Sequence, residues 1–455
     1  MSLFNKENSM RRPRISSIRL LGLAAVIVSP LVTSALAQPL AAPGMGNSSA
    51  SQPFPGPGKV EPAGPLDLAS AIDLALSANP ALAAAARELQ AVEGAVIQAG
   101  VRPNPEISTL VEDTQQKATR TTTLQINQAI ELGGKRAARI ESAERGRDVA
   151  AADLAAQGLE TRAAVVAAFF DVLVAQERVR LAEALLDLAQ RAAQVASRRV
   201  AAGKVSPVEE TKARVAEASV RVEFNLAQGE LAAARKRLAA TWGNPAPRFE
   251  RADGRTEALP TVLSSEEIRS RLAVSPALAR ARLEVDRRSA LAEVERTRRI
   301  PNVTVTVGAQ RVEELGRNQA IVGLSVPLPL FDRNQGNLLE ALRRADKARD
   351  ELAATEIRLS TEVAQAYERL KALSLEVDTL QKDILPGAQS AYEAASKGYE
   401  LGKFNFLEVL DAQRTFFQAR SQYLRALADA HRASADIDRV LGATTTTEPA
   451  GKSQP

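Results

Sequence analysis

Carboxylates that follow two glycine-containing segments are the side chains whose spacing could do chemistry in this chain. Glu408 and Asp411 are three residues apart, so both can face the same side of a helix. Glu209 occupies the corresponding place after the earlier glycine segment, where Lys212 stands in place of a second acid. Grouped acids attract cations. Most helical carboxylates simply face solvent, and both interpretations stay open for these residues.

Other kinds of reactive site find little support in the composition. The chain has no cysteine and a single histidine, His431, whereas a tight metal site needs several such ligands. We interpret His431 as a solvated or half-buried helix position. No nucleophile–base pair, phosphate-binding loop or pair of catalytic carboxylates stands out. The sequence therefore predicts a protein that is not an enzyme, with no cofactor and no metal site.

The segments that carry the acids belong to an internal repeat, because the proline and glycine residues that mark the ends of predicted elements recur after 196 to 199 residues. An offset that holds along the whole chain indicates one architectural unit that is used twice. The matching positions are Asn79-Pro80 with Ser275-Pro276, Gly203 with Gly402, and Trp242-Gly243 with Leu441-Gly442.

Each copy of the repeat combines a very long helix with a pair of strands. Proline-free sequence rich in alanine and leucine predicts the first long helix over about 134–202, and the second runs over about 336–400. Apolar and polar residues alternate within about 105–131 and 302–330, which is the period of a strand. The fold class is therefore mainly α with a small β part, in which long antiparallel helices carry four strands per chain.

The two ends of the chain differ in composition from the repeats. Residues 1–37 combine a basic stretch, an apolar stretch and Ala35-Leu36-Ala37, as in a secretory signal peptide. They hold most of the formal net charge of +5, so the mature chain gives no reason to expect nucleic-acid binding. The predicted parts are a signal peptide at 1–37, a disordered linker at 38–64, a first repeat at 65–243, an inter-repeat segment at 244–262, a second repeat at 263–442 and a disordered tail at 443–455.

The long helices are dotted with charged residues, so a membrane-bound form of this chain would have to insert through its strands. Four strands cannot close a barrel by themselves, and an open sheet leaves unsatisfied backbone groups in lipid. Three copies would supply about twelve strands, which is within the range of outer-membrane barrels.

Several of these segments resemble the TolC-like outer-membrane factors of tripartite efflux systems. Within that family the chain is most similar to the outer-membrane component of cobalt–zinc–cadmium and nickel–cobalt resistance pumps. The resemblance covers essentially residues 65–442. Besides the paired helix starts and the two glycine turns, it rests on residues 111–114, 131–136, 201–214, 327–336 and 402–414.

The resemblance implies a homotrimer with a periplasmic α-barrel and a 12-stranded outer-membrane β-barrel, of which each chain forms one third. It implies a passive channel in the outer membrane and periplasm of a Gram-negative bacterium. The implied partners are a periplasmic adaptor protein, an inner-membrane proton-driven RND pump and outer-membrane lipid, with divalent heavy-metal cations (cobalt, zinc, cadmium or nickel) as the transported substrate. Many relatives carry a lipid-anchoring cysteine after the signal peptide, and this chain has none.

The resemblance also implies roles for the glycine segments and for the acids that follow them. A helix that reverses within a few residues needs a left-handed position, which glycine adopts without steric cost. In the family these turns face the periplasm and bind the adaptor, and the acids line a periplasmic gate where a three-fold axis gathers their copies. The implied docking residues are Ala202, Gly203, Lys204, Val205, Leu401, Gly402, Lys403 and Phe404, and the implied gate residues are Glu209, Glu408 and Asp411.

Two alternatives to a heavy-metal channel remain open at this point. The same type of channel could serve organic drug efflux or type I protein secretion. The chain could instead be a periplasmic coiled-coil protein without a pore, which the alternation of apolar and polar residues in the strand segments argues against.

Overall fold

A computed structural model describes residues 61–254, 259–401, 403–404 and 406–442, and all of them belong to one structural unit. The signal peptide, residues 38–60 of the predicted linker, the predicted tail and Gly402 lie outside the described residues. Residues 61–64, where the sequence predicts the end of the linker, are described, and the side chain of Glu61 is buried.

In the first half of the chain, two short helices precede two strands and two long helices. Asn79 separates the short helices, because its side chain accepts a hydrogen bond from Leu82 N at 2.9 Å and Pro80 supplies the first helical residue. The longest helix has 67 residues, about 100 Å at 1.5 Å per residue. The elements are α1 (Leu68–Ala78), α2 (Pro80–Ala99), β2 (Glu106–Glu112), β3 (Thr121–Ile130), α3 (Lys135–Ala201) and α4 (Pro207–Ala240).

The second half of the chain follows the same order of elements. Ser275 caps its second helix as Asn79 does in the first half: the hydroxyl accepts from Leu278 N at 3.3 Å, and Pro276 follows. The elements are α5 (Ser265–Ala273), α6 (Pro276–Arg298), β5 (Val303–Val312), β6 (Arg317–Ser325), α7 (Gln335–Thr379), the π-helical turn η1 (Leu380–Ile384), α8 (Leu385–Glu400) and α9 (Phe406–Leu441).

Prolines cause two departures from the elements predicted for the second half. β6 ends at Ser325 rather than near residue 330, because Pro327 and Pro329 have no N–H to donate to a strand ladder. The second long helix is not uniformly α-helical, since η1 separates α7 from α8 just before Pro386. A proline removes one backbone hydrogen bond and crowds the preceding turn, and a wider π turn relieves that crowding.

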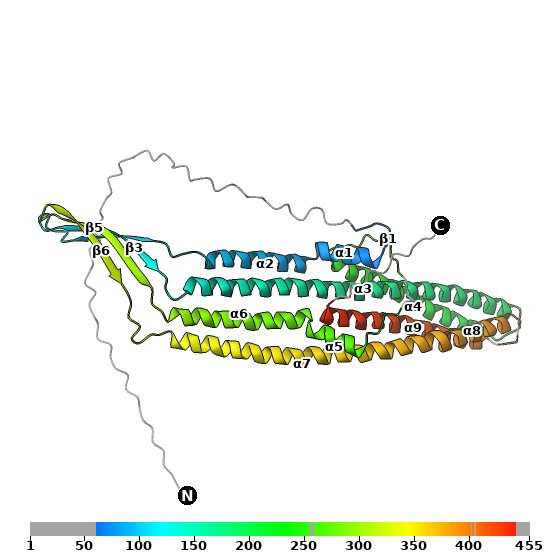
Figure 1. The fold of residues 1–455 in the computed structure, drawn as a ribbon. Helices are drawn as coiled ribbons and strands as arrows, with labels where there is room; N and C mark the ends of the chain where they lie inside the picture. The colour runs from blue at the N-terminus through cyan, green and yellow to red at the C-terminus, as the bar shows by residue number, and fades with distance from the viewer. Residues whose placement is uncertain (1–60, 255–258, 402, 405, 443–455) are drawn as a thin grey trace, which may run out of the picture. The chain divides into compact units, whose positions relative to one another are not determined.

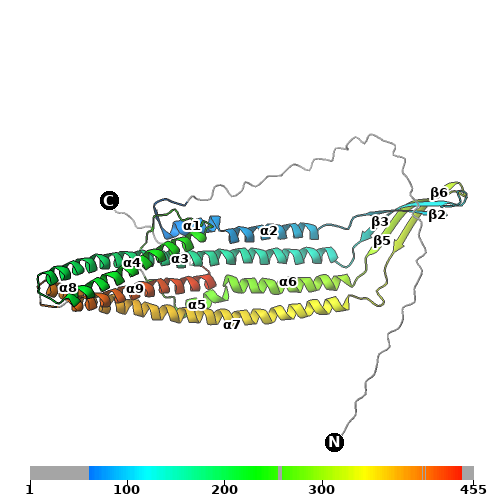
Figure 2. The ribbon, with the colours of Figure 1, turned by 180° about the vertical axis from the view of Figure 1, so that it is seen from behind.

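The helices α2, α3, α6 and α7 lie side by side, with the strands at one end and the α3–α4 and α8–α9 turns at the other (Figures 1 and 2). α3 contacts α2, α4, α6 and α9, so it connects the two halves of the chain. Among the described residues, no single helix is both long and apolar enough to cross a membrane. The pair α1–α2, bent by 42°, meets that requirement only jointly, by length and composition.

Four antiparallel strands form one sheet in the order β2-β3-β5-β6. The central pairing of β3 with β5 joins the two halves of the chain and places Ile126 opposite Val307. Ile107 of β2 and Val322 of β6 extend this row across all four strands. Facing residues of paired strands lie on the same side of a sheet, so the row gives the sheet one apolar face.

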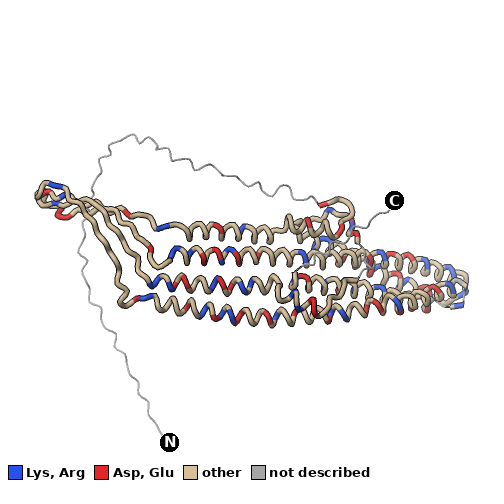
Figure 3. The backbone as a smooth tube through the Cα atoms, in the orientation of Figure 1, with Lys and Arg blue, Asp and Glu red and all other residues tan. Residues whose placement is uncertain are grey.

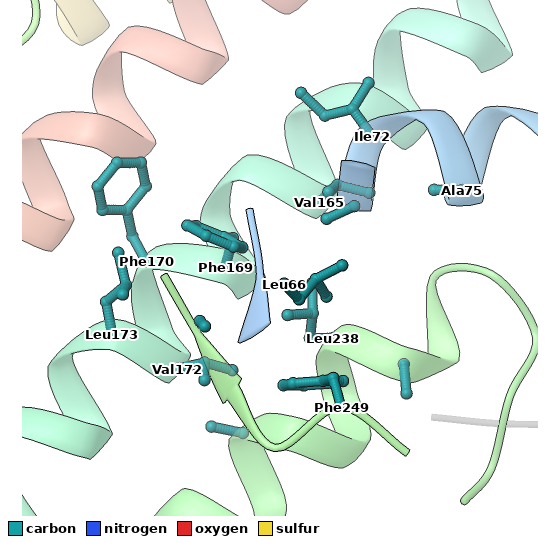
Figure 4. Packing of buried hydrophobic residues seen from close by; sticks show 14 of the residues in the cluster. Leu66, Ile72, Ala75, Val165, Phe169, Phe170, Val172, Leu173, Leu238 and Phe249 are labelled. Atoms are coloured by element: carbon teal, nitrogen blue, oxygen red, sulfur yellow. The ribbon is translucent and has the colours of Figure 1, made fainter. Parts of the chain in front are cut away.

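A cluster of buried apolar side chains lies where α1, α3 and α4 meet (Figure 4). Phe169 of α3 and Leu238 of α4 pack there with Leu66, and all three are fully buried. Leu66 belongs to β1 (Pro65–Leu66), which pairs in parallel with β4 (Arg251–Ala252). The segment that precedes α1 and the segment that follows α4 are therefore held together at the middle of α3.

Candidate functional site

The turn between α3 and α4 is built around Gly203, whose φ of 66° lies in the left-handed region. Lys204 N donates to the Arg199 carbonyl and Gly203 N donates to the Val200 carbonyl, both at 2.9 Å. This is the Schellman pattern, in which a left-handed residue ends a helix and its neighbours satisfy the last carbonyl groups. Ser206 then caps α4, so the chain reverses within a few residues, as predicted.

The turn between α8 and α9 makes the corresponding reversal and adds an aromatic contact. Lys403 N donates to the Gly398 carbonyl at 2.8 Å, which matches the bond that closes the first turn. The ring of Phe404 lies so close to Gly398 that a Cβ atom at that position would collide with it. Glycine is therefore required at residue 398 by close approach.

Both turns present small, apolar and basic groups to solvent. Leu401 is 63% exposed and Phe404 is 46% exposed, although both are large apolar residues. Exposed apolar side chains beside a rigid turn can pack against another protein. The exposed members of the predicted docking set are Ala202, Gly203, Lys204, Leu401, Lys403 and Phe404, and Val205 is half-buried.

The three predicted gate acids are all exposed in the single chain. Glu408 and Asp411 share one exposed side of α9, where Val409 and Gln413 point into the packed interior. Glu209 is also exposed and lies in the first turn of α4, where a negative charge complements the helix dipole.

Contacts between the two helical hairpins bring Arg199 of α3 and Tyr399 of α8 together near the turns. The guanidinium carbon of Arg199 lies 4.8 Å from the centre of the Tyr399 ring, a cation–π contact. Burial raises the pKa of the Tyr399 hydroxyl, while the charge of Arg199 lowers this pKa and the charge of Glu209 raises it. The charge of Glu209 thus acts on Tyr399, whereas Glu408 and Asp411 occupy a face of α9.

A groove of about 880 Å³ lies between α3, α4 and α9. Its lining mixes cations such as Arg178 and Arg425 with Glu223, the amide of Gln413 and the ring of Phe417. Arg178 already forms an ion pair with Glu230 of α4. This mixed lining fits solvated helix packing better than a pocket with a few converging polar groups.

His431 is half-buried on α9, in agreement with its interpretation as an ordinary helix position. Its ring stacks on Phe170 of α3, with centres 3.5 Å apart and planes 9° from parallel. Within the described ranges, no three His, Asp or Glu side chains form a group that could hold a metal ion.

Glu61 is a buried carboxylate whose role sequence reasoning missed. Its oxygens accept hydrogen bonds from Arg248 N at 2.6 Å, Phe249 N at 3.0 Å and Trp242 Nε1 at 3.2 Å, and also from the Asn244 side chain. Burial alone would raise the pKa of Glu61, but these donors outweigh it and lower the pKa below its ordinary value. A lone acid in a proline- and glycine-rich stretch carries no periodicity that could have revealed this contact.

Comparisons with known proteins match nearly the whole described chain. A sequence model of the outer membrane efflux protein family matches residues 71–244 and again residues 268–443. The cobalt-zinc-cadmium resistance protein CzcC of Cupriavidus metallidurans is 52% identical over 382 residues, which cover 84% of this chain and 91% of CzcC. The nickel-cobalt-cadmium resistance protein NccC of Alcaligenes xylosoxydans xylosoxydans is 32% identical over 300 residues, or 63% of this chain and 64% of NccC.

Solved structures agree with this match at the level of the fold. The open state of the MtrE outer membrane channel of Neisseria gonorrhoeae has a TM-score of 0.69 to this chain at 20% sequence identity, and the match covers 83% of this chain and 89% of MtrE. The family match spans both halves, and the identity to CzcC extends over most of both chains. The chain belongs to the outer membrane efflux protein family.

Proposed function

We propose that this protein is the outer-membrane channel of a tripartite efflux system for divalent heavy-metal cations. The observation that carries the proposal is the 52% identity to CzcC, a cobalt-zinc-cadmium resistance protein, over 91% of that protein. The chain acts as a passive conduit rather than an enzyme, which its membership of the outer membrane efflux protein family supports. Cobalt, zinc, cadmium or nickel is the transported substrate.

A homotrimer with a closed twelve-stranded barrel is the assembly that we propose. In the described residues β2 and β6 are each paired on one side only, so every chain leaves two open sheet edges. Open edges are costly in lipid, and three chains joined edge to edge satisfy them. Each chain then supplies one third of the barrel wall.

The two faces of the sheet support a barrel with a lipid-facing outside and a polar inside. On the apolar face Ile107 is 70% exposed and Val322 is 81% exposed in the single chain. On the opposite face Thr306 Oγ1 donates to Asn127 Oδ1 at 2.7 Å, and Asn127 Nδ2 donates to Ser108 Oγ at 3.1 Å. Alternation of apolar and polar residues along a strand is the pattern of membrane barrels.

A two-fold internal repeat accounts for the shared order of elements in the two halves. The family match to two successive ranges supports it. So does a recurring contact, since Gly243 lies against Pro80 at the end of the first half and Gly442 lies against Pro276 at the end of the second. Six similar helical hairpins in the trimer would form the periplasmic α-barrel.

The α3–α4 and α8–α9 turns are the proposed docking sites of a periplasmic adaptor, which links the channel to a proton-driven inner-membrane pump. Their exposed small and apolar residues and their distance from the strands support this role (Figure 1). Beyond the turns, copies of Glu408 and Asp411 from three chains would form a negative ring at the periplasmic gate, and rings of acids favour cations. Glu209 is proposed to contribute less to the ring, because Lys212 stands where a second acid would follow it in the first half.

Deletion of the gene tests the proposed substrate. The deletion strain should lose tolerance to at least one of cobalt, zinc, cadmium and nickel, and a plasmid copy should restore it. Tolerance to hydrophobic drugs should stay unchanged in the same strain. Unchanged tolerance to all four metals, together with new sensitivity to drugs, would overturn the metal assignment and favour a drug-efflux channel. In the wild-type strain, absence of this protein from the outer-membrane fraction would instead favour a periplasmic coiled-coil protein.

A further inference from the structure

Basic residues from four segments of the chain lie at the junction between the sheet and the helices (Figure 3). These segments are the end of α2, the start of α3, the end of α6 and the start of α7. We call this set the basic junction, and its members are Arg102, Lys135, Arg136, Arg139, Arg298, Arg299 and Arg333.

Hydrogen bonds join these four segments to one another next to the sheet. Each bond joins a side chain of one segment to the neighbouring segment, so the basic residues keep a common position relative to the sheet. The three bonds run from Arg136 Nε to the Gly100 carbonyl at 2.7 Å, from Lys135 Nζ to Asn302 Oδ1, and from Asn334 Nδ2 to the Glu295 carbonyl at 2.9 Å.

Acids neutralise only part of the basic junction. Arg139 pairs with Glu131, and Arg298 pairs with Glu295 at 2.7 Å. Arg102, Arg299 and Arg333 are exposed, and in the described part of the chain no ion pair involves any of them. Three exposed cations per chain therefore remain available to an external anion.

Large apolar side chains lie next to these cations in sequence, in the segment between β6 and α7. Phe331 is 91% exposed, Leu328 is 75% exposed and Leu330 is 65% exposed. Leu330 N donates to the Leu328 carbonyl at 2.9 Å, and the prolines at 327 and 329 have no N–H to satisfy. The segment can therefore face an apolar medium without leaving these backbone donors unpaired.

The opposite end of the sheet lacks this excess of positive charge. The β2–β3 connection holds Asp113 together with Lys117 and Arg120, and at the β5–β6 connection Arg311 contacts Glu313 at 3.4 Å. Acids and bases are thus balanced there, and the basic excess belongs to one end of the strands only (Figure 3).

We propose that the basic junction binds the anionic headgroups of phospholipids at the periplasmic face of the outer membrane, while Leu328, Leu330 and Phe331 enter the adjoining acyl region. This inference rests on the proposed function, in which the sheet spans that membrane. Anionic headgroups are attracted by clustered Lys and Arg, and aromatic residues sit at the membrane interface. The arrangement would anchor the chain at the membrane surface on which the sheet ends.

The test is a lipid titration of the full-length protein in neutral detergent micelles, followed by native mass spectrometry. The probes are phosphatidylglycerol and phosphatidylcholine, and the measured quantity is the ratio of their affinities. We expect a preference for phosphatidylglycerol in the wild-type protein. Each of the changes Arg102→Gln, Arg299→Gln and Arg333→Gln should reduce that ratio roughly fivefold, the effect of one arginine near an anionic surface. The three changes together form the junction triple variant, which should reduce the ratio most.

A matched control removes the same charge at the other end of the sheet. The triple variant Lys117→Gln/Arg120→Gln/Arg317→Gln should keep the wild-type ratio, whereas Phe331→Ser should weaken binding of both lipids. Arg333→Gln alone keeps the test valid if the junction triple variant fails to fold, because Arg333 is exposed.

Two results would overturn the inference. One is an equal affinity of the wild-type protein for the two lipids, and the other is an unchanged ratio in Arg333→Gln and in the junction triple variant. Flotation of the wild-type protein with phosphatidylcholine vesicles measures whether it enters a bilayer. It therefore distinguishes a failure of the lipid-binding inference from a failure of the proposed function. A wild-type protein that does not float with those vesicles would overturn both proposals, because the sheet would then not enter a bilayer.

Discussion

The first and second halves of the chain follow the same order of elements but are fastened in different ways. In the first half, the buried carboxylate of Glu61 joins the segment before α1 to the segment after α4, from which it accepts four hydrogen bonds. The second half is closed at the corresponding place by the half-exposed Arg271, whose side chain reaches the Gly442 carbonyl. The exposed acid pair of the second half has a single acid as its counterpart in the first, since Lys212 replaces the second acid.

The two halves can therefore differ in their tasks although their elements follow the same order. The first half has the larger set of buried hydrogen bonds, those accepted by Glu61. The second half has Phe404 at its turn and the acids Glu408 and Asp411 in the helix that follows. We therefore expect changes in the first half to reduce stability most. Changes in the second half should alter ion passage most.

The largest loss of stability is expected for Glu61→Ala. The change leaves the backbone N–H groups of Arg248 and Phe249 and the indole of Trp242 without their acceptor, at a cost of about 3 kcal/mol in the free energy of unfolding. Glu61→Gln keeps an acceptor and should cost less. Arg271→Ala is the matched change in the second half and should cost under about 1 kcal/mol. Thermal unfolding in detergent measures all three, and equal losses would contradict the comparison.

A smaller loss is expected for Gly203→Val in the first turn. A β-branched residue at a φ of 66° is strained by about 1–2 kcal/mol, so the turn should distort and crosslinking to the adaptor should fall. Gly229→Val serves as the control, because Gly229 lies within α4 away from the turn, is not among the glycines with a positive φ and has open space for a side chain. In the second turn, Gly398→Val should displace Phe404 instead. Undiminished crosslinking in Gly203→Val and in Gly398→Val would reject the turns as docking sites.

Acid should destabilise the fold in part through protonation of Glu61. The pKa of Glu61 is lowered in the folded chain, so its stabilising contribution is present above the unfolded value of about 4.3 and is lost as the pH falls through the folded pKa. The unfolding temperature of the wild-type protein should therefore drop more steeply below about pH 4 than that of Glu61→Gln. Parallel curves for the two proteins would show that Glu61 does not titrate in this way.

The smallest of the stability effects is expected where the two halves touch near the turns. Arg199→Ala removes the cation–π contact to Tyr399, which is worth about 0.5–1 kcal/mol at an exposed site. Tyr399→Leu should cause a similar loss, and the double variant should lose little more than either single variant. Fully additive losses in the unfolding temperature would mean that the two side chains are not coupled.

Much of the fold follows from local patterns in the sequence. The capping of α2 at Asn79, the absence of proline from α3 and the alternation around Ile126 each act over a few residues. The sequence therefore predicts the helices and strands closely. The turns were also predictable, because a left-handed residue such as Gly203 has a local steric reason.

Contacts between distant segments were not predictable in this way. Glu61 meets its donors across more than 180 residues, and Arg199 meets Tyr399 only after both hairpins are packed. The pairing of β1 with β4 involves strands of two residues, which are too short to show any period. The π turn before Pro386 was missed because the propensity of the surrounding residues favours a continuous helix.

In the function that we propose, this protein conducts divalent metal cations and the acids of the second half favour their passage. The most direct test is the current through the purified protein in planar bilayers bathed in cobalt or zinc chloride. We predict cation-selective channels whose selectivity falls in Glu408→Gln/Asp411→Asn and changes little in Glu209→Gln. A protein that inserts but passes no divalent cations, or equal reversal potentials in all three proteins, would contradict the claim.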